Sequence, residues 1–100
     1  VLGDMAELGS GARRYHQDIG EYAKEQNIDL LFSIGVLSQS ASSAMEQKGE
    51  HFSSQQNVIT RLNQLIKGAD CSISILLKGS RSAKMEQIVE QIIADNNLSN

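Results

Sequence analysis

The class of fold is indicated by one stretch, residues 57–93, which reads NVITRLNQLIKGADCSISILLKGSRSAKMEQIVEQII. Apolar residues recur in it at helical spacing twice, which predicts two amphipathic helices. Their apolar stripes are Val58, Ile59, Leu62, Leu65 and Ile66, and then Met85, Ile88, Val89, Ile92 and Ile93. Between the helices, residues 71–77 alternate isoleucine with serine and then continue with two leucines, which is typical of a strand. The stretch therefore predicts a helix, a strand and a helix.

The residues before this stretch continue the alternation. We predict strands over residues 1–4, 29–34 and 50–52, and helices over residues 14–26 and 39–47. Ser38 is placed to cap the second of these helices, and Ser53, with Gln56 three residues later, to cap the helix that follows. Strands that alternate with helices form mostly parallel sheets with right-handed crossovers. The prediction is a three-layer, Rossmann-like α/β domain with a mostly parallel sheet. Because the sequence starts at Val1 without a methionine or room for a full strand, we expect this domain to be truncated at its N-terminus.

The composition fits one globular domain, since 40% of the 100 residues are apolar and 21% are charged. A net charge of −3 argues against nucleic acid or an anionic membrane surface as a partner. No apolar run approaches the ~20 residues of a membrane span. The first half has four basic and eight acidic residues and the second half five and four, so an anion site is expected in the second half. The single cysteine, Cys71, cannot form an internal disulfide, which fits a cytoplasmic protein. Because it begins a predicted strand, we expect it in the core.

Ligands of open parallel sheets bind beyond the carboxyl ends of the strands, so three turns are candidate sites. They are the first turn (residues 3–9), the second turn (residues 35–38) and the third turn (residues 78–82). The third turn contains Lys78, Gly79, Ser80 and Arg81 directly before a helix, where free N–H groups and the helix dipole favour a carboxylate or phosphate. Ser80 or Ser82 is placed to cap that helix. A capped helix with two solvated basic residues is the alternative.

The first turn contains Asp4 and Glu7, which could bind a metal or an ammonium group or could serve turn geometry alone. His16 and His51 have no cysteines at metal-ligand spacing, so no metal site is predicted. We expect His16 on a helix surface or at a helix cap, with a role as a base the less favoured alternative, and His51 packed at a strand edge. Neither Gly-x-Ser-x-Gly nor a phosphate loop occurs, and no catalytic residue is identified.

Two motifs resemble a known family. They are Gly-Asp-Met-Ala-Glu-Leu-Gly over residues 3–9, followed by His16 and Gly20, and Leu-Leu-Lys-Gly-Ser-Arg-Ser-Ala over residues 76–83. Together with residues 29–35 and Gly-Glu-His-Phe over residues 49–52, they resemble the C-terminal domain of the Mur ligases, in particular of the members that add D-alanyl-D-alanine. The resemblance covers nearly all of the chain. It implies that residues 1–100 are most of that domain, without the N-terminal UDP-binding and central ATP-binding domains.

The resemblance implies a part of a bacterial, cytoplasmic, ATP-dependent ligase of peptidoglycan synthesis. Such a ligase joins D-Ala-D-Ala to UDP-N-acetylmuramoyl-tripeptide through an acyl phosphate, with ATP and Mg²⁺ bound mainly outside this chain. The domain would bind the dipeptide and close the active site, and it would be inactive alone. The family's usual nucleotide-contacting segment, which resembles Asp-Asp-Ser-Tyr-Asn-Ala-Asn, is absent from these residues.

Carried over by motif, Lys78, Gly79, Ser80 and Arg81 would line the dipeptide side of the cleft, with Asp4 and Glu7 on the neighbouring turn. The implied roles are that Arg81 and the helix start hold the carboxylate of the dipeptide, while Asp4 or Glu7 orients its ammonium group. Two alternatives explain the fold without the motifs. One is a free-standing flavodoxin-like or nucleotide-binding module, and the other is an interaction domain.

Overall fold

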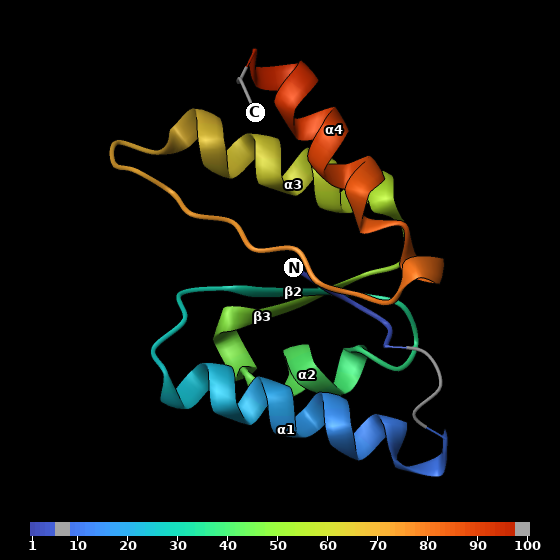
Figure 1. Cartoon of the computed structure of the whole chain (residues 1–100). Helices are drawn as coiled ribbons and strands as arrows, with labels where there is room; N and C mark the ends of the chain where they lie inside the picture. The colour runs from blue at the N-terminus through green and yellow to red at the C-terminus, as the bar shows by residue number, and fades with distance from the viewer. Residues whose placement is uncertain (6–8, 98–100) are drawn as a thin grey trace.

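The computed structural model describes residues 1–5 and 9–97, which form three layers around a small parallel sheet (Figure 1). The sheet has the order β1-β2-β3, with β1 at Leu2–Gly3, β2 at Leu31–Ile34 and β3 at Gly49–Phe52. Helices α1 (Ala12–Glu25) and α2 (Gln39–Ala44) cover one face, and α3 (Gln55–Gly68) and α4 (Met85–Asn96) lie on the other side. Both strand pairs are parallel, with Leu2 opposite Ser33 and Phe32 opposite Glu50. The predicted α/β class and parallel sheet are confirmed.

The alternation of side chains along β2 separates two hydrophobic cores. Phe32 belongs to the core under α3 and α4, whereas its neighbour Leu31 belongs to the core under α1 and α2. The first core comprises Phe32, Val58, Ile59, Leu62, Met85, Ile88 and Ile92, and the second comprises Leu2, Leu31, Ala41 and Met45. The first core uses the two apolar stripes that the sequence predicts, including the buried Met85, and Met45 is buried in the second core.

The strand predicted over residues 71–77 is wrong. These residues form no strand, and a single parallel bridge joins Lys78 to Leu2. Around that bridge, Gly3 N donates to Lys78 O over 2.8 Å and Lys78 N donates to Val1 O over 2.9 Å. The pairing stops there because β1 is only two residues long, and residues 71–75 have no neighbouring strand within the described part of the chain. Cys71 is consequently exposed and not in the core.

The helix starts differ from their predicted caps. Ser54, one residue later than expected, caps α3 by accepting a hydrogen bond from Asn57 N. Neither Ser80 nor Ser82 caps α4, because a 3₁₀ helix over Arg81–Ala83 and a left-handed Lys84, with φ of 52°, precede its first residue. Gln55 Nε2 donates to the carbonyls of Ala83 and Lys84 and so joins the start of α3 to the segment before α4.

In the ranges 1–5 and 9–97, no helix has the length and apolar character to span a membrane.

Candidate functional site

Asp4, directly after β1, joins the first turn to the second. Its Oδ1 accepts a hydrogen bond from Ser38 N over 2.7 Å, and its Oδ2 accepts one from Leu37 N over 3.2 Å. The sequence predicts that the hydroxyl of Ser38 caps α2, but this hydroxyl donates to Ile34 O instead. The N–H groups before α2 are therefore satisfied by a carboxylate that lies more than 30 residues away in the sequence.

Asp4 also joins the first turn to the third. Its backbone oxygen accepts hydrogen bonds from Ser80 N over 3.2 Å and from Ser80 Oγ over 3.0 Å. Beneath this contact, a Cβ on Gly3 would lie 2.9 Å from Ala83 Cβ, and a Cβ on Gly79 would lie 3.1 Å from the same atom. A side chain at Gly3 would therefore force its neighbours to shift, whereas one at Gly79 would require them to yield by a few tenths of an ångström. The three turns meet at one edge of the sheet, with Asp4 at their centre.

The other predicted site residues lie around Asp4 or outside the described residues. Gly79 and Ser80 are half-buried in the third turn, whereas Lys78 and Arg81 are exposed. No ion pair in the described part of the chain involves either basic side chain. Both remain available to an anion above the turn. Glu7 lies outside the described residues.

The predicted direct passage from the third turn into a helix is wrong. Arg81 begins a 3₁₀ helix, and α4 starts only at Met85, which is buried. The left-handed Lys84 separates the two helices, and Gln87 N within α4 donates to Lys84 O. The third turn thus presents two cations and a short 3₁₀ turn, and the N-terminus of α4 is set back from Arg81.

His16 lies beneath the first turn, in a position that the sequence does not predict. Its side chain is completely buried, which contradicts the predicted surface or capping position. Its Nδ1 lies 2.6 Å from Ala12 O one turn earlier in α1, and its Nε2 accepts a hydrogen bond from Met5 N over 3.1 Å. The helical spacing of Ala12 and His16 is visible in the sequence. The contact with Met5 is not, because it depends on how α1 packs beneath the first turn.

His51 lies on β3, which is an edge strand of the sheet, as the sequence predicts, but its side chain is exposed. Its Nδ1 is 2.9 Å from the hydroxyl of Ser33 in β2. Ser33 donates in turn to Ser42 Oγ, and Ser42 donates to Gln39 O. This chain satisfies two buried hydroxyls, which would otherwise destabilise the fold. His51 therefore has a structural role in this network.

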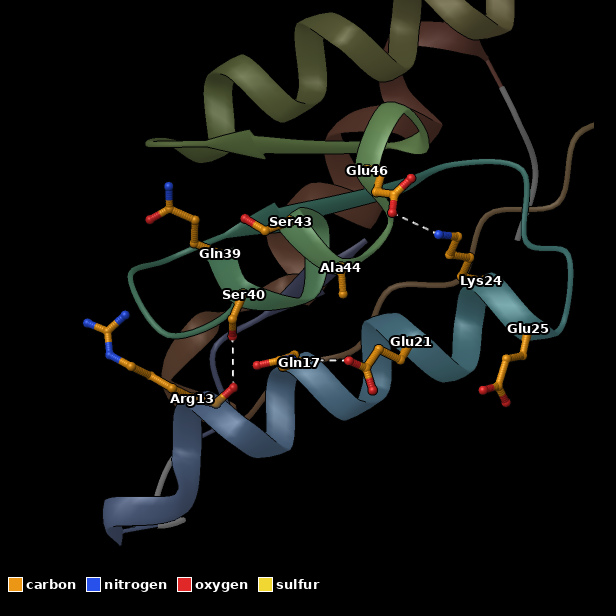
Figure 2. Close-up of a pocket in the computed structure, with 10 residues that line it drawn as sticks. All are labelled: Arg13, Gln17, Glu21, Lys24, Glu25, Gln39, Ser40, Ser43, Ala44 and Glu46. Carbon is orange, nitrogen blue, oxygen red and sulfur yellow. Dashed lines mark hydrogen bonds and ion pairs between the residues drawn. The ribbon is translucent and has the colours of Figure 1, made fainter.

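A hollow of about 680 Å³ lies between α1 and α2, away from the centre of the three turns (Figure 2). Four of its polar side chains form two pairs. Lys24 forms an ion pair with Glu46 over 3.0 Å, and Gln17 Nε2 donates to Glu21. Ser40 Oγ donates to the backbone of Arg13 across the groove. The groove is thus a polar contact between two helices.

Within residues 1–5 and 9–97, no cluster of three or more histidine, cysteine or acidic residues could hold a metal ion.

Comparisons with known proteins agree on one class of enzyme, although no model of a protein family matches the chain. The chain is 46% identical over 92 residues to the UDP-N-acetylmuramoyl-tripeptide–D-alanyl-D-alanine ligase of Escherichia coli strain K12. It is 41% identical over 96 residues to the enzyme of that name from Buchnera aphidicola (Acyrthosiphon pisum). These matches cover 92% and 96% of the chain but only 20% and 21% of the relatives.

A solved structure supports the same assignment. The chain superposes on a crystal structure of MurF from Acinetobacter baumannii with a TM-score of 0.81 and 28% sequence identity. The match covers 94% of this chain and 21% of that one. Sequence and structure comparisons therefore agree that the chain spans about one fifth of the proteins it matches.

Proposed function

Because the chain belongs to the Mur ligase family, we propose that it is the C-terminal domain, or most of it, of a ligase that joins D-Ala-D-Ala to UDP-N-acetylmuramoyl-tripeptide. The reaction would be a cytoplasmic step of bacterial peptidoglycan synthesis. The UDP-binding and ATP-binding domains would be supplied by other parts of the same polypeptide, so the isolated domain would be inactive. A free-standing flavodoxin-like module is not favoured, because the relatives are named as ligases.

The chemistry divides naturally between such domains. A carboxylate is a poor electrophile, and in this reaction ATP with Mg²⁺ supplies the phosphate that turns the tripeptide carboxylate into an acyl phosphate. ATP and Mg²⁺ would be bound mainly by the other domains of the polypeptide. The task proposed for this chain is to hold the dipeptide with its amine close to the electrophile, which lowers the entropic part of the barrier.

The three turns are the proposed dipeptide side of the cleft, and the contacts of Asp4 carry this proposal. Exposed Arg81 and Lys78 would bind the carboxylate of D-Ala-D-Ala, Arg81 with a bidentate pair. Gly79 would allow close approach of the backbone. Asp4 already accepts two backbone N–H groups, so we propose that it shapes the turns and leaves the ammonium group of the dipeptide to Glu7.

The test is an assay of the full-length protein. Phosphate release should require ATP, Mg²⁺, UDP-N-acetylmuramoyl-tripeptide and D-Ala-D-Ala together, and mass spectrometry should detect the UDP-linked pentapeptide. A single L-alanine in place of the dipeptide is the control and should give no product. Phosphate release without pentapeptide, or binding of a flavin by the chain, would contradict the proposal.

A further inference from the structure

The hydrogen-bond partners of His16 determine which of its ring nitrogens donates and which accepts. Met5 N can only donate, so Nε2 of His16 must carry its lone pair and accept. Ala12 O can only accept, so the neutral ring carries its proton on Nδ1 and donates it over 2.6 Å. Both polar atoms of a completely buried side chain are thereby satisfied. His16 is consequently a fixed acceptor aimed at the first turn, with no lone pair left for a base.

The helix that carries His16 is itself held in place. A Cβ on Gly20, one turn further along α1, would collide with the carbonyl oxygen of Ala41 in α2, so the two helices pack with their backbones in close approach. Ser40 Oγ also donates to Arg13 O across this interface. Because α1 cannot slide easily on α2, the position of Nε2 is set by a packed interface.

From this base, a chain of hydrogen bonds reaches all three turns. His16 holds Met5 N, and Met5 directly follows Asp4. Asp4 then holds Leu37 and Ser38 in the second turn through its carboxylate, and Ser80 in the third turn through its carbonyl. Without the imidazole acceptor, the half-buried Met5 N–H would lose its partner and Asp4 would lose its anchor on the α1 side.

We propose that His16 is a positioning residue, which acts through Met5 and Asp4 to hold the three turns in the arrangement that binds D-Ala-D-Ala. This inference rests on the proposed function, because it assigns the turns to the dipeptide. It predicts a selective effect. Loss of the Met5 contact should weaken use of the dipeptide, while ATP and the UDP-linked tripeptide, which we assign mainly to other domains, should be used as before.

A matched pair of substitutions in the full-length ligase separates positioning from stability. In His16→Asn the amide can replace Nδ1 toward Ala12 O but is too short to reach Met5, whereas in His16→Gln the amide oxygen can replace Nε2. We expect the Asn variant to raise the KM for D-Ala-D-Ala about 5- to 20-fold, and the Gln variant to change it less than about threefold. The KM values for ATP and UDP-tripeptide should stay within about twofold.

A merely structural role would lower kcat through loss of folded enzyme and leave the KM of the dipeptide unchanged in both variants, which would overturn the inference. Equal KM values in the Asn and Gln variants would overturn it as well. The wild type gives an independent check. With selectively ¹⁵N-labelled methionine, the Met5 amide should exchange with solvent at least about tenfold more slowly than an unstructured amide. A rapidly exchanging Met5 amide would contradict the hydrogen bond and the inference. An inactive wild type would instead refute the proposed function.

Discussion

Strand β2 and residues 71–77 have similar patterns in the sequence but different structures. Both are short apolar segments between helices, and both are predicted strands. β2 pairs with β1 on one side and β3 on the other, and three of its four side chains, Leu31, Phe32 and Ile34, contribute to the two cores. Residues 71–77 form no ladder with the sheet: Val1 N donates to Leu76 O, Ile75 and Leu77 pack against the core under α3 and α4, and the one parallel bridge described there joins Leu2 to Lys78, just after the segment. The difference teaches that a β-pattern is realised where neighbouring strands complete the ladder.

The largest effect is expected from a pair of alanine substitutions, one in each segment. Phe32 in β2 is 3% exposed and packs edge-on against Phe52, with ring centroids 5.1 Å apart. We expect Phe32→Ala to lower the free energy of unfolding by about 3–5 kcal/mol. Ile73 is 46% exposed, so Ile73→Ala should cost less than about 1 kcal/mol. Urea unfolding of the full-length protein, followed by probes in this domain, measures both. Equal losses would mean that residues 71–77 are as well packed as β2.

The turns that follow the two segments give a second test. Gly35, after β2, has φ of 111°, and a Cβ there would lie 2.5 Å from the carboxylate of Asp4. Gly35→Ala should therefore destabilise the domain by about 2–3 kcal/mol. Gly79, after residues 71–77, has neighbours at 3.0–3.3 Å that need to yield only a few tenths of an ångström, so Gly79→Ala should cost about 1 kcal/mol.

Thermal melting of both variants checks the order, with Gly68→Ala as the control, because no atom lies within 4 Å of a Cβ at that position. A larger loss at Gly79 than at Gly35 would show that the third turn is the more rigid one.

A third test concerns function at the third turn. Arg81 is exposed and has no carboxylate partner in the described ranges, so its substitution should leave stability unchanged. Arg81→Lys keeps the charge but loses the planar fork, and we expect the KM for D-Ala-D-Ala to rise about tenfold in the full-length enzyme. Arg14→Lys, at an exposed arginine paired with Asp18, is the matched control. Unchanged KM and kcat in Arg81→Lys would exclude the bidentate role.

The sequence predicts what depends on local pattern. The helical stripes, the parallel sheet and the grouping of three turns at the carboxyl ends of strands follow from periodicity and topology. The hydrogen bonds that hold those turns together do not. Asp4 replaces Ser38 as the cap of α2 across 34 residues, and His16 reaches Met5 from beneath the first turn. Both contacts depend on how α1 and α2 pack, and the spacing of residues in the sequence does not predict that packing.

The same limit explains residues 71–77. Alternating isoleucine and serine satisfy the pattern of a strand, but hydrogen bonding requires a partner of matching length. β1 supplies only two residues. The alternating pattern thus shows that the segment is able to form a strand. Whether it forms a hydrogen-bonded ladder depends on the length of the neighbouring strand.

The smallest expected effect tests how the layer above residues 71–77 is held. Asp95 in α4 accepts hydrogen bonds from Asn63 Nδ2 in α3 over 2.8 Å and from Gln91 Nε2 over 2.7 Å. These bonds, that from Asn63 first, hold the pKa of Asp95 below its ordinary value. A carboxyl whose pKa is lowered by folding stabilises the native state above its unfolded pKa and loses that contribution as the pH falls through its folded pKa.

Because Asp95 is solvent-exposed, we expect only a small drop in the unfolding midpoint between about pH 5 and pH 3 from this group. Asp95→Asn should flatten that part of the pH profile, and Glu90→Gln, an exposed neutralisation on the same helix, is the control for general charge effects. If Asp95→Asn and Glu90→Gln flatten the profile equally, the contact with Asn63 does not fasten α4 to α3. The apolar contacts of Ile88 and Ile92 would then hold the upper layer without it.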